Sequence, residues 1–132
     1  MANLEYIKNK NNLIAIIIRR KFKKKGIHFL TDNKLSLQLG YMQHPKNHQI
    51  LPHYHLKQKR IVHNTNEILF IKSGKVRVDF FIKKKKITFR TLETGDFIAI
   101  VSGGHSFRMI KPTEMIEIKQ GPYISHKDKV VF

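Results

Sequence analysis

Val-Arg-Val-Asp-Phe-Phe-Ile, residues 76–82, is the clearest strand pattern in the chain. Its apolar side chains recur at every second position: Val76, Val78, Phe80 and Ile82. The charged residues Arg77 and Asp79 stand between them. Because successive side chains of a strand point to opposite faces, this pattern predicts a strand with one buried and one more exposed face.

Similar stretches surround this strand and are separated from it by turn residues. Ser73-Gly74 precedes it, and the lysine run at 83–86 follows it. Further strands are expected over residues 13–18, 27–30, 35–42, 53–55, 61–71, 87–92, 97–101, 105–110 and 114–119. No segment has an apolar stripe at helical spacing over three turns. Many short strands at near-regular spacing predict an all-β sandwich or barrel, as a single domain over residues 1–132.

The composition restricts the kinds of site and partner. The chain has 132 residues and no cysteine, which excludes disulfides, a thiolate nucleophile and cysteine-based zinc sites. Its formal charge of +17 would suit a nucleic-acid partner, although a coding bias toward lysine, isoleucine and asparagine also explains it. The basic runs at 19–25 and 83–86 fall at expected turns and contain few aromatic residues. We therefore interpret both runs as solvated hairpin tips and disfavour nucleic-acid binding.

The apolar stretch Leu13–Ile18 bears on localisation. It is too short for the core of a signal peptide and far short of the ~20 residues that span a bilayer. Basic residues follow it at once, and it is typical of a buried strand. We expect a cytoplasmic protein without a membrane partner.

Four residues at separate points of the chain suggest a metal site. His53 and His55 are separated by one residue, so on a strand both imidazoles would lie on one face and could reach one ion. Glu67 and His105, on neighbouring strands, would complete a mononuclear centre. Without cysteine the ligands are nitrogen and oxygen, which suit Fe, Mn, Zn, Ni or Cu as a divalent ion. The alternative for the histidine pair is an edge strand that faces water.

Glu117 and Lys119 are the candidate catalytic residues. They share one face of an expected strand and could act as acid, base or substrate anchor near the metal. The alternative is an exposed salt pair of little energetic value. Glu67 lies among apolar neighbours, where burying a lone carboxylate is costly, and a metal or Arg60 would offset that cost.

The order of these motifs resembles the cupin superfamily. Gly40, the pair His53 and His55, Glu67 and Gly74 match the first cupin motif, and Glu67 and Gly74 stand at its usual spacing. The second motif is matched in shape by the following residues: Gly95-Asp96, Gly103-Gly104 and His105. The resemblance covers the chain from about Leu13 onward. It implies a jelly-roll β-barrel in which His53, His55, Glu67 and His105 hold one divalent metal.

A narrower similarity points to small bacterial single-domain cupins, which are often encoded among surface-polysaccharide genes. It is carried by Thr65 with Glu67, by Gly103-Gly104-His105 and by the C-terminal stretch from Ile116 to Phe132. This resemblance implies binding or conversion of a small polar molecule, such as a sugar or sugar nucleotide, with isomerisation or epimerisation as one candidate reaction. It also implies a homodimer, because small cupins commonly pair through their sheets. A non-catalytic carbohydrate-binding or sensor module is the alternative function.

Overall fold

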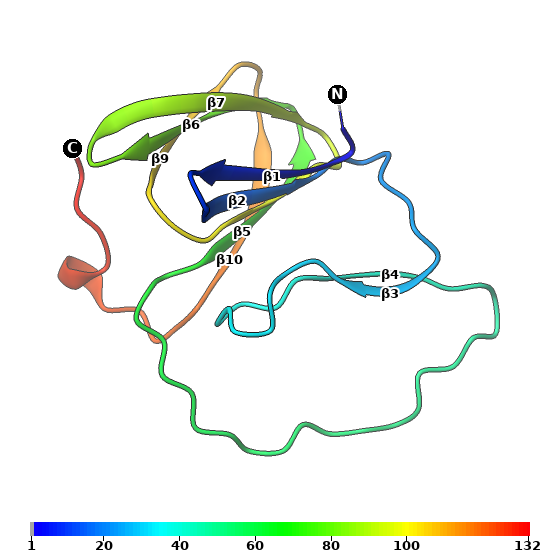
Figure 1. The fold of residues 1–132 in the computed structure, drawn as a ribbon. Coiled ribbons are helices and arrows are strands. Elements are labelled where there is room, and N and C mark those ends of the chain that lie inside the picture. The colour runs from blue at the N-terminus through cyan, green and yellow to red at the C-terminus, as the bar shows by residue number, and fades with distance from the viewer. Residues whose placement is uncertain (1) are drawn as a thin grey trace. The chain divides into compact units, whose positions relative to one another are not determined.

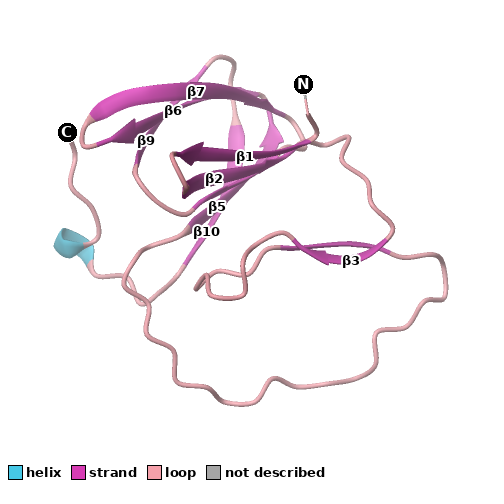
Figure 2. Cartoon of the chain, viewed as in Figure 1, coloured by secondary structure: helices cyan, strands magenta, loops and turns pink. Residues whose placement is uncertain are grey.

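The computed structural model describes residues 2–132 and is built of antiparallel β-sheets (Figure 1). Its contacts divide the chain into two compact units. The large unit contains the described residues up to Phe22 together with Asn64–Phe132, and the small unit is Lys23–His63. Among the described residues, the only helical element is a short 3-10 turn at Ser125–Lys127, visible in Figure 2.

Eight strands form the two sheets of the large unit. Their bounds are β1 Leu4–Asn9, β2 Asn12–Ile18, β5 Glu67–Ser73, β6 Lys75–Ile82, β7 Lys85–Glu93, β8 Phe97–Ile100, β9 Gly104–Met109 and β10 Glu114–Lys119. The first sheet has the order β1-β2-β8-β5-β10, and the second has the order β7-β6-β9. All neighbouring strands pair antiparallel.

The central strand β6 shows why the sequence folds in this way. Val76, Val78 and Phe80 are fully buried, while Arg77 and Asp79 between them are partly exposed. The alternation predicted for residues 76–82 is therefore confirmed. The buried side chains of β6 join those of β2, β5, β7 and β8 in one hydrophobic cluster, so the two sheets share a single core. Burial of this apolar surface is the main favourable contribution to folding.

Turns at the two ends of β6 match the expected positions. Gly74 precedes β6 at φ +107, and a Cβ there would lie 2.3 Å from the main-chain oxygen of Pro112. Only glycine permits both that conformation and that close approach. Lys83 and Lys84 make the tight turn into β7, both at positive φ, and their side chains are exposed. The solvated hairpin tip predicted for 83–86 is confirmed.

The small unit has a single pair of strands, β3 Gly26–Phe29 and β4 Gly40–Gln43. Two predictions are wrong here. The strand expected over 35–42 is reduced to its last residues in β4, and the stretch His53-Tyr54-His55 is not a strand, because residues 44–66 contain none. A strand needs a hydrogen-bonded neighbour, and this stretch has no ladder partner. Its apolar side chains are not buried either: Tyr54 is 85% exposed.

The other departures lie at strand boundaries of the large unit. Strand β5 begins at Glu67 rather than at residue 61, and β1 was not expected at all. The sequence of β1 lacks a clean apolar alternation, because Ile7, its one buried side chain, shares a strand face with Glu5 and Asn9.

The fold class is confirmed as all-β. The described strands form separate antiparallel sheets, an arrangement compatible with a jelly-roll, and they show no closed barrel. The single cupin domain over residues 1–132 stays a prediction. Over residues 2–132, no helix has the length and apolar character needed to cross a bilayer.

Candidate functional site

A pocket of about 650 Å³ in the large unit brings several of the predicted site residues together. Its titratable side chains are Glu67, His105 and Glu117 on β5, β9 and β10, together with Lys129 of the C-terminal segment. Apolar side chains supply most of the remainder: Leu69, Phe81, Phe107, Met115, Val130, Val131 and Phe132. Ligand sites commonly combine an apolar cavity of this size with a few convergent polar groups.

Strand register explains why the charged side chains gather. Glu67 opens β5 and pairs directly with Lys119 of β10, and Glu117 pairs with Leu69 two residues further along. Side chains two residues apart on a strand share a face, so Glu117 and Lys119 both flank Glu67. The spacing that suggested a shared face for Glu117 and Lys119 is thus confirmed by the ladder.

His105 meets Glu67 across the two sheets. Its Nε2 lies 3.2 Å from Oε2 of Glu67, and both side chains are largely buried. His105 is on β9 of the three-stranded sheet, whereas Glu67 is on β5 of the five-stranded sheet. The pair therefore joins the two layers at the pocket. The start of β5 is anchored next to it, because the buried Asn66 exchanges hydrogen bonds with Gln120 and donates to the Val101 carbonyl.

The surroundings favour the ionised form of Glu67. The hydrogen bond that His105 donates lowers the pKa of Glu67, and burial opposes this effect. Electrostatic interactions with His105 and Lys119, and a hydrogen bond with Glu117, lower the pKa of Glu67 further. A neutral imidazole that donates from Nε2 keeps Nδ1 as an acceptor. In the described structure Nδ1 of His105 is buried and has no hydrogen-bond partner.

Lys119 is held at the edge of this cluster by a residue from the C-terminal segment. Its Nζ lies 3.2 Å from Oδ2 of Asp128, and this hydrogen bond raises the pKa of Lys119. The negative charges of Asp128, Glu117 and Glu67 raise the pKa of Lys119 as well, while burial lowers it. Lys119 is thus kept as a cation beside the two glutamates.

The C-terminal residues form a wall of the pocket that no strand pattern predicts. The ring of Phe132 packs edge-on against Phe81, with centroids 5.3 Å apart. A Cβ at Gly104 would lie 3.0 Å from Cζ of Phe132, so this glycine allows the close approach. The segment Lys129–Phe132 lacks regular secondary structure, which is why periodicity in the sequence does not reveal its position.

The four predicted metal ligands are divided between the two units. Glu67 and His105 form the ion pair in the large unit, while His53 and His55 lie in the small unit. The rings of His53 and His55 are 5.4 Å apart and exposed, and Nδ1 of His53 lies 2.8 Å from the Leu51 carbonyl. Within each unit as described, no three His, Asp or Glu side chains gather as metal ligands do. One imidazole and its carboxylate are therefore half of the expected donor set, and the complete centre stays a prediction.

Comparison with known proteins adds no further identification. No family model, curated protein or solved structure matches the chain. The resemblance to cupins therefore stays a prediction from sequence, and the functional argument rests on the pocket around Glu67 and His105.

Proposed function

We propose that the pocket around Glu67 and His105 binds a small polar molecule and moves a proton on it. The observation that supports this proposal is the His105–Glu67 pair, with Nε2 and Oε2 3.2 Å apart, in the wall of a cavity of about 650 Å³. A histidine oriented by a carboxylate is an arrangement that enzymes use for general acid–base catalysis.

In this proposal His105 is the base that takes the proton, and Glu67 orients its imidazole. The carboxylate of Glu67 holds the Nε2–H donor, so Nδ1 is the atom that accepts a proton. Glu117 supplies a second carboxylate at the same wall. Lys119 lies beside Glu67 but outside the pocket lining, and it would have to leave its pair with Asp128 to offer a positive charge to a developing oxyanion.

The substrate class that suits these groups is a sugar or sugar nucleotide. In isomerisation or epimerisation, a base takes the proton from a carbon next to a carbonyl, an enolate forms, and a proton returns to carbon. One histidine and a second acid are sufficient for both transfers. We infer a role in surface-polysaccharide synthesis from the resemblance to small cupins, and we propose that the protein acts in the cytoplasm.

The same resemblance gives a second candidate role for these residues, in which His105 is a ligand of one divalent transition metal and not the base. Glu67 and His105 would be the ligands from the large unit, with His53 and His55 as those from the small unit. Such an ion would polarise a substrate oxygen or acidify a bound water. Elemental analysis of the wild type, His53→Ala and His105→Ala tests this part, with His63→Ala as a control. Unchanged metal content in the first two variants would remove the metal from the proposal.

A non-catalytic binding module is the second candidate function. It is favoured by the burial of Nδ1 of His105 and by the apolar side chains that Val130, Val131 and Phe132 add to the pocket. Under the enzyme proposal, the buried Nδ1 must become accessible to a substrate, and we propose a shift of the C-terminal segment, which lines the same pocket, as the movement that exposes it. Diethylpyrocarbonate labelling tests this access, since Phe132→Ala should label faster at His105 than the wild type does.

The deciding experiment follows carbon-bound hydrogen directly. Free hexoses and nucleoside-diphosphate sugars are incubated with the protein in D₂O, and the loss of C–H signals is followed by proton NMR. We expect exchange with the wild type, and a loss of about 100-fold or more in His105→Gln, as is typical for removal of a general base. Glu67→Gln should also impair exchange, while the exposed controls His63→Gln and Glu114→Gln should not. Ligand binding without any exchange would instead support the binding module.

A further inference from the structure

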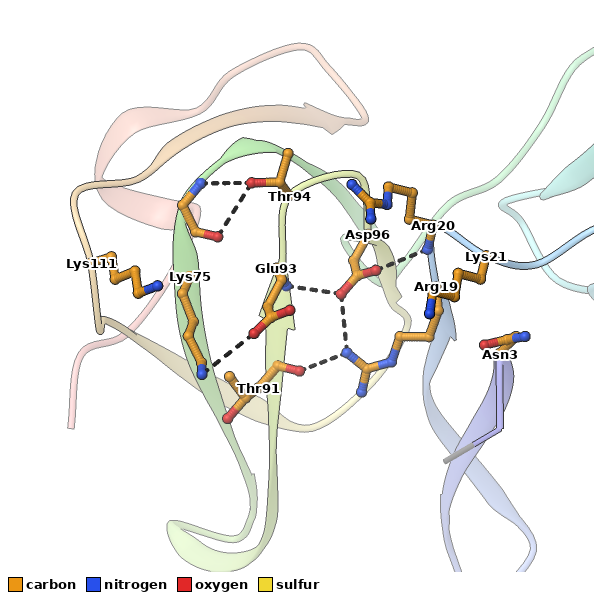
Figure 3. A pocket seen from close by; sticks show the side chains of 11 residues that line it. Asn3, Arg19, Arg20, Lys21, Lys75, Thr91, Glu93, Thr94, Asp96 and Lys111 are labelled. Atoms are coloured by element: carbon orange, nitrogen blue, oxygen red, sulfur yellow. Dashed lines mark hydrogen bonds and ion pairs between the residues drawn. The ribbon is translucent and has the colours of Figure 1, made fainter.

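A second pocket of the large unit, about 610 Å³ in volume, is rich in basic side chains (Figure 3). It is lined by Asn3 before β1, by residues 19–21 after β2, by the β5–β6 turn with the start of β6, by the end of β7 with its turn into β8, and by the β9–β10 loop. Its charged members are five basic and two acidic residues: Arg19, Arg20, Lys21, Lys75, Lys111, Glu93 and Asp96. None of its lining residues lines the pocket around His105.

Both acidic side chains of this pocket are already engaged. Asp96 is largely buried and accepts hydrogen bonds from Nη1 of Arg19 at 3.1 Å and from the main-chain nitrogens of Arg20 and Glu93. Glu93 pairs with Nζ of Lys75 at 3.4 Å. Across residues 2–132, no acidic partner is found for Arg20, Lys21 or Lys111. The pocket therefore has a surplus of positive charge.

The main chain fixes the positions of the basic residues. The carbonyl of Lys75 accepts hydrogen bonds from the nitrogens of Ile110, at 2.9 Å, and Lys111, at 3.2 Å, which keeps Lys75 and Lys111 together. On the other side, the stem of Arg20 packs on Gly95, where a Cβ would lie 2.6 Å from Cδ of the arginine. In Figure 3, Lys75 and Lys111 appear on the left of the pocket, and Arg20 and Lys21 on the right.

Arg19 adds an incompletely satisfied charge to the same wall. Its Nη1 donates to Asp96 and to the Thr91 carbonyl, at 2.6 Å. Its Nε and Nη2 are buried and lack hydrogen-bond partners in the described structure. Unsatisfied buried donors are rare and costly. Arg19 thus keeps two hydrogen-bond donors without an acceptor at this wall, while its charge is paired with Asp96.

We propose that this pocket binds the diphosphate group of a small molecule of the nucleoside-diphosphate class. Clustered Lys and Arg recognise phosphate through charge-assisted hydrogen bonds. Basic residues on two sides suit a ligand with more than one phosphate, and the volume suits a nucleotide better than a single inorganic ion. This inference does not depend on the function proposed for the His105 pocket.

The experiment measures binding of pyrophosphate and of inorganic phosphate by titration calorimetry at fixed salt. We expect pyrophosphate to bind more tightly than phosphate, and Arg20→Gln and Lys111→Gln each to weaken pyrophosphate binding about tenfold. Each has a matched control with the same change in net charge, Arg108→Gln on β9 and Lys85→Gln on β7. Both control side chains are exposed and lie outside the pocket. Thermal melts of all variants establish that they are folded.

Three outcomes would overturn the proposal. The first is a failure of pyrophosphate to bind at millimolar concentration, and the second is equal weakening by the control variants. The third concerns nucleic acid as the source of phosphate. If a single-stranded RNA oligonucleotide binds more tightly than a nucleoside diphosphate and depends on Lys85 as much as on Lys111, the positive charge acts diffusely and not through this pocket.

Discussion

The two pockets of the large unit differ in how their charges are balanced. Around His105, two carboxylates lie beside a histidine and a lysine: Glu67 pairs with His105, and Lys119 interacts with Asp128, Glu117 and Glu67. Around Asp96, the carboxylates are fully engaged and three basic side chains have no described acidic partner. The first arrangement suits internal proton transfer, while the second suits capture of an anion from outside. One β-scaffold thus supports two chemically different surfaces.

The largest expected effect on stability comes from a substitution in the hydrophobic core on which both sheets pack. Phe80 is fully buried on β6 and pairs with His105 of β9 in the ladder. Phe80→Ala leaves a cavity in the core and should lower the free energy of unfolding by about 3–5 kcal/mol. Urea denaturation followed by circular dichroism measures this change. Phe89→Ala on β7, where the ring is 47% exposed, is the matched control and should cost much less.

A substitution of intermediate effect, Asp96→Asn, should impair the basic pocket and leave the His105 pocket intact. Asp96→Asn removes the charge that balances Arg19 and weakens hydrogen bonds to Arg20 and Glu93. We expect a loss of about 2–3 kcal/mol in unfolding free energy, because the substitution leaves a largely buried arginine without its counter-ion. Proton exchange by the His105 pocket should persist in the folded variant. A variant as stable as the wild type would show that Asp96 does not organise the basic pocket.

A smaller effect concerns pH and the His105 pocket. Because the pKa of Glu67 is lower in the folded protein than its ordinary value of 4.5, the ionised carboxylate stabilises the fold above that value. This stabilisation is lost as pH falls through the lowered folded pKa. Glu5, paired with Arg90, and Asp79, paired with Arg77, have lowered pKa values and act in the same direction.

Urea denaturation from pH 7 down to pH 3 measures this dependence. Glu67→Gln should be less stable at pH 7 and should lose less stability on acidification than the wild type does. Glu114→Gln, whose pair with Lys72 is exposed, should follow the wild-type curve. Parallel curves for wild type and Glu67→Gln would contradict the assigned role of the His105–Glu67 pair.

The sequence-based predictions were accurate for residues of the His105 pocket and missed the basic pocket. Strand β6 and the shared face of Glu117 and Lys119 were predictable, because alternation is a local property of a strand. The expectation that Glu67 and His105 meet came from the resemblance to cupins, since their contact joins two different sheets. The prediction of a strand at His53–His55 was wrong, because the spacing of two histidines does not show whether another strand is available to pair with them. Homodimer formation and the metal remain predictions.

The basic pocket was missed because its residues belong to turns and strand ends. The run at 19–25 was interpreted as a solvated hairpin tip, yet the side chain of Arg19 is only 11% exposed and pairs with Asp96. Their contact spans most of the chain, and nothing in the local sequence indicates it. The spatial neighbours of a charged turn depend on strand order, which composition and periodicity do not specify.

Strand β8 has a kinetic consequence for both pockets. It pairs with β2 and β5, and its partners lie far away in sequence: Ala15 stands opposite Ile100. Contacts of such long range form slowly, since the chain must close a large loop before it gains any stabilising contact. The hairpins β1–β2 and β6–β7 can form early, but Asp96 precedes β8 and His105 follows it. We therefore expect refolding intermediates with these hairpins protected and neither pocket assembled, which pulse-labelled hydrogen exchange can detect.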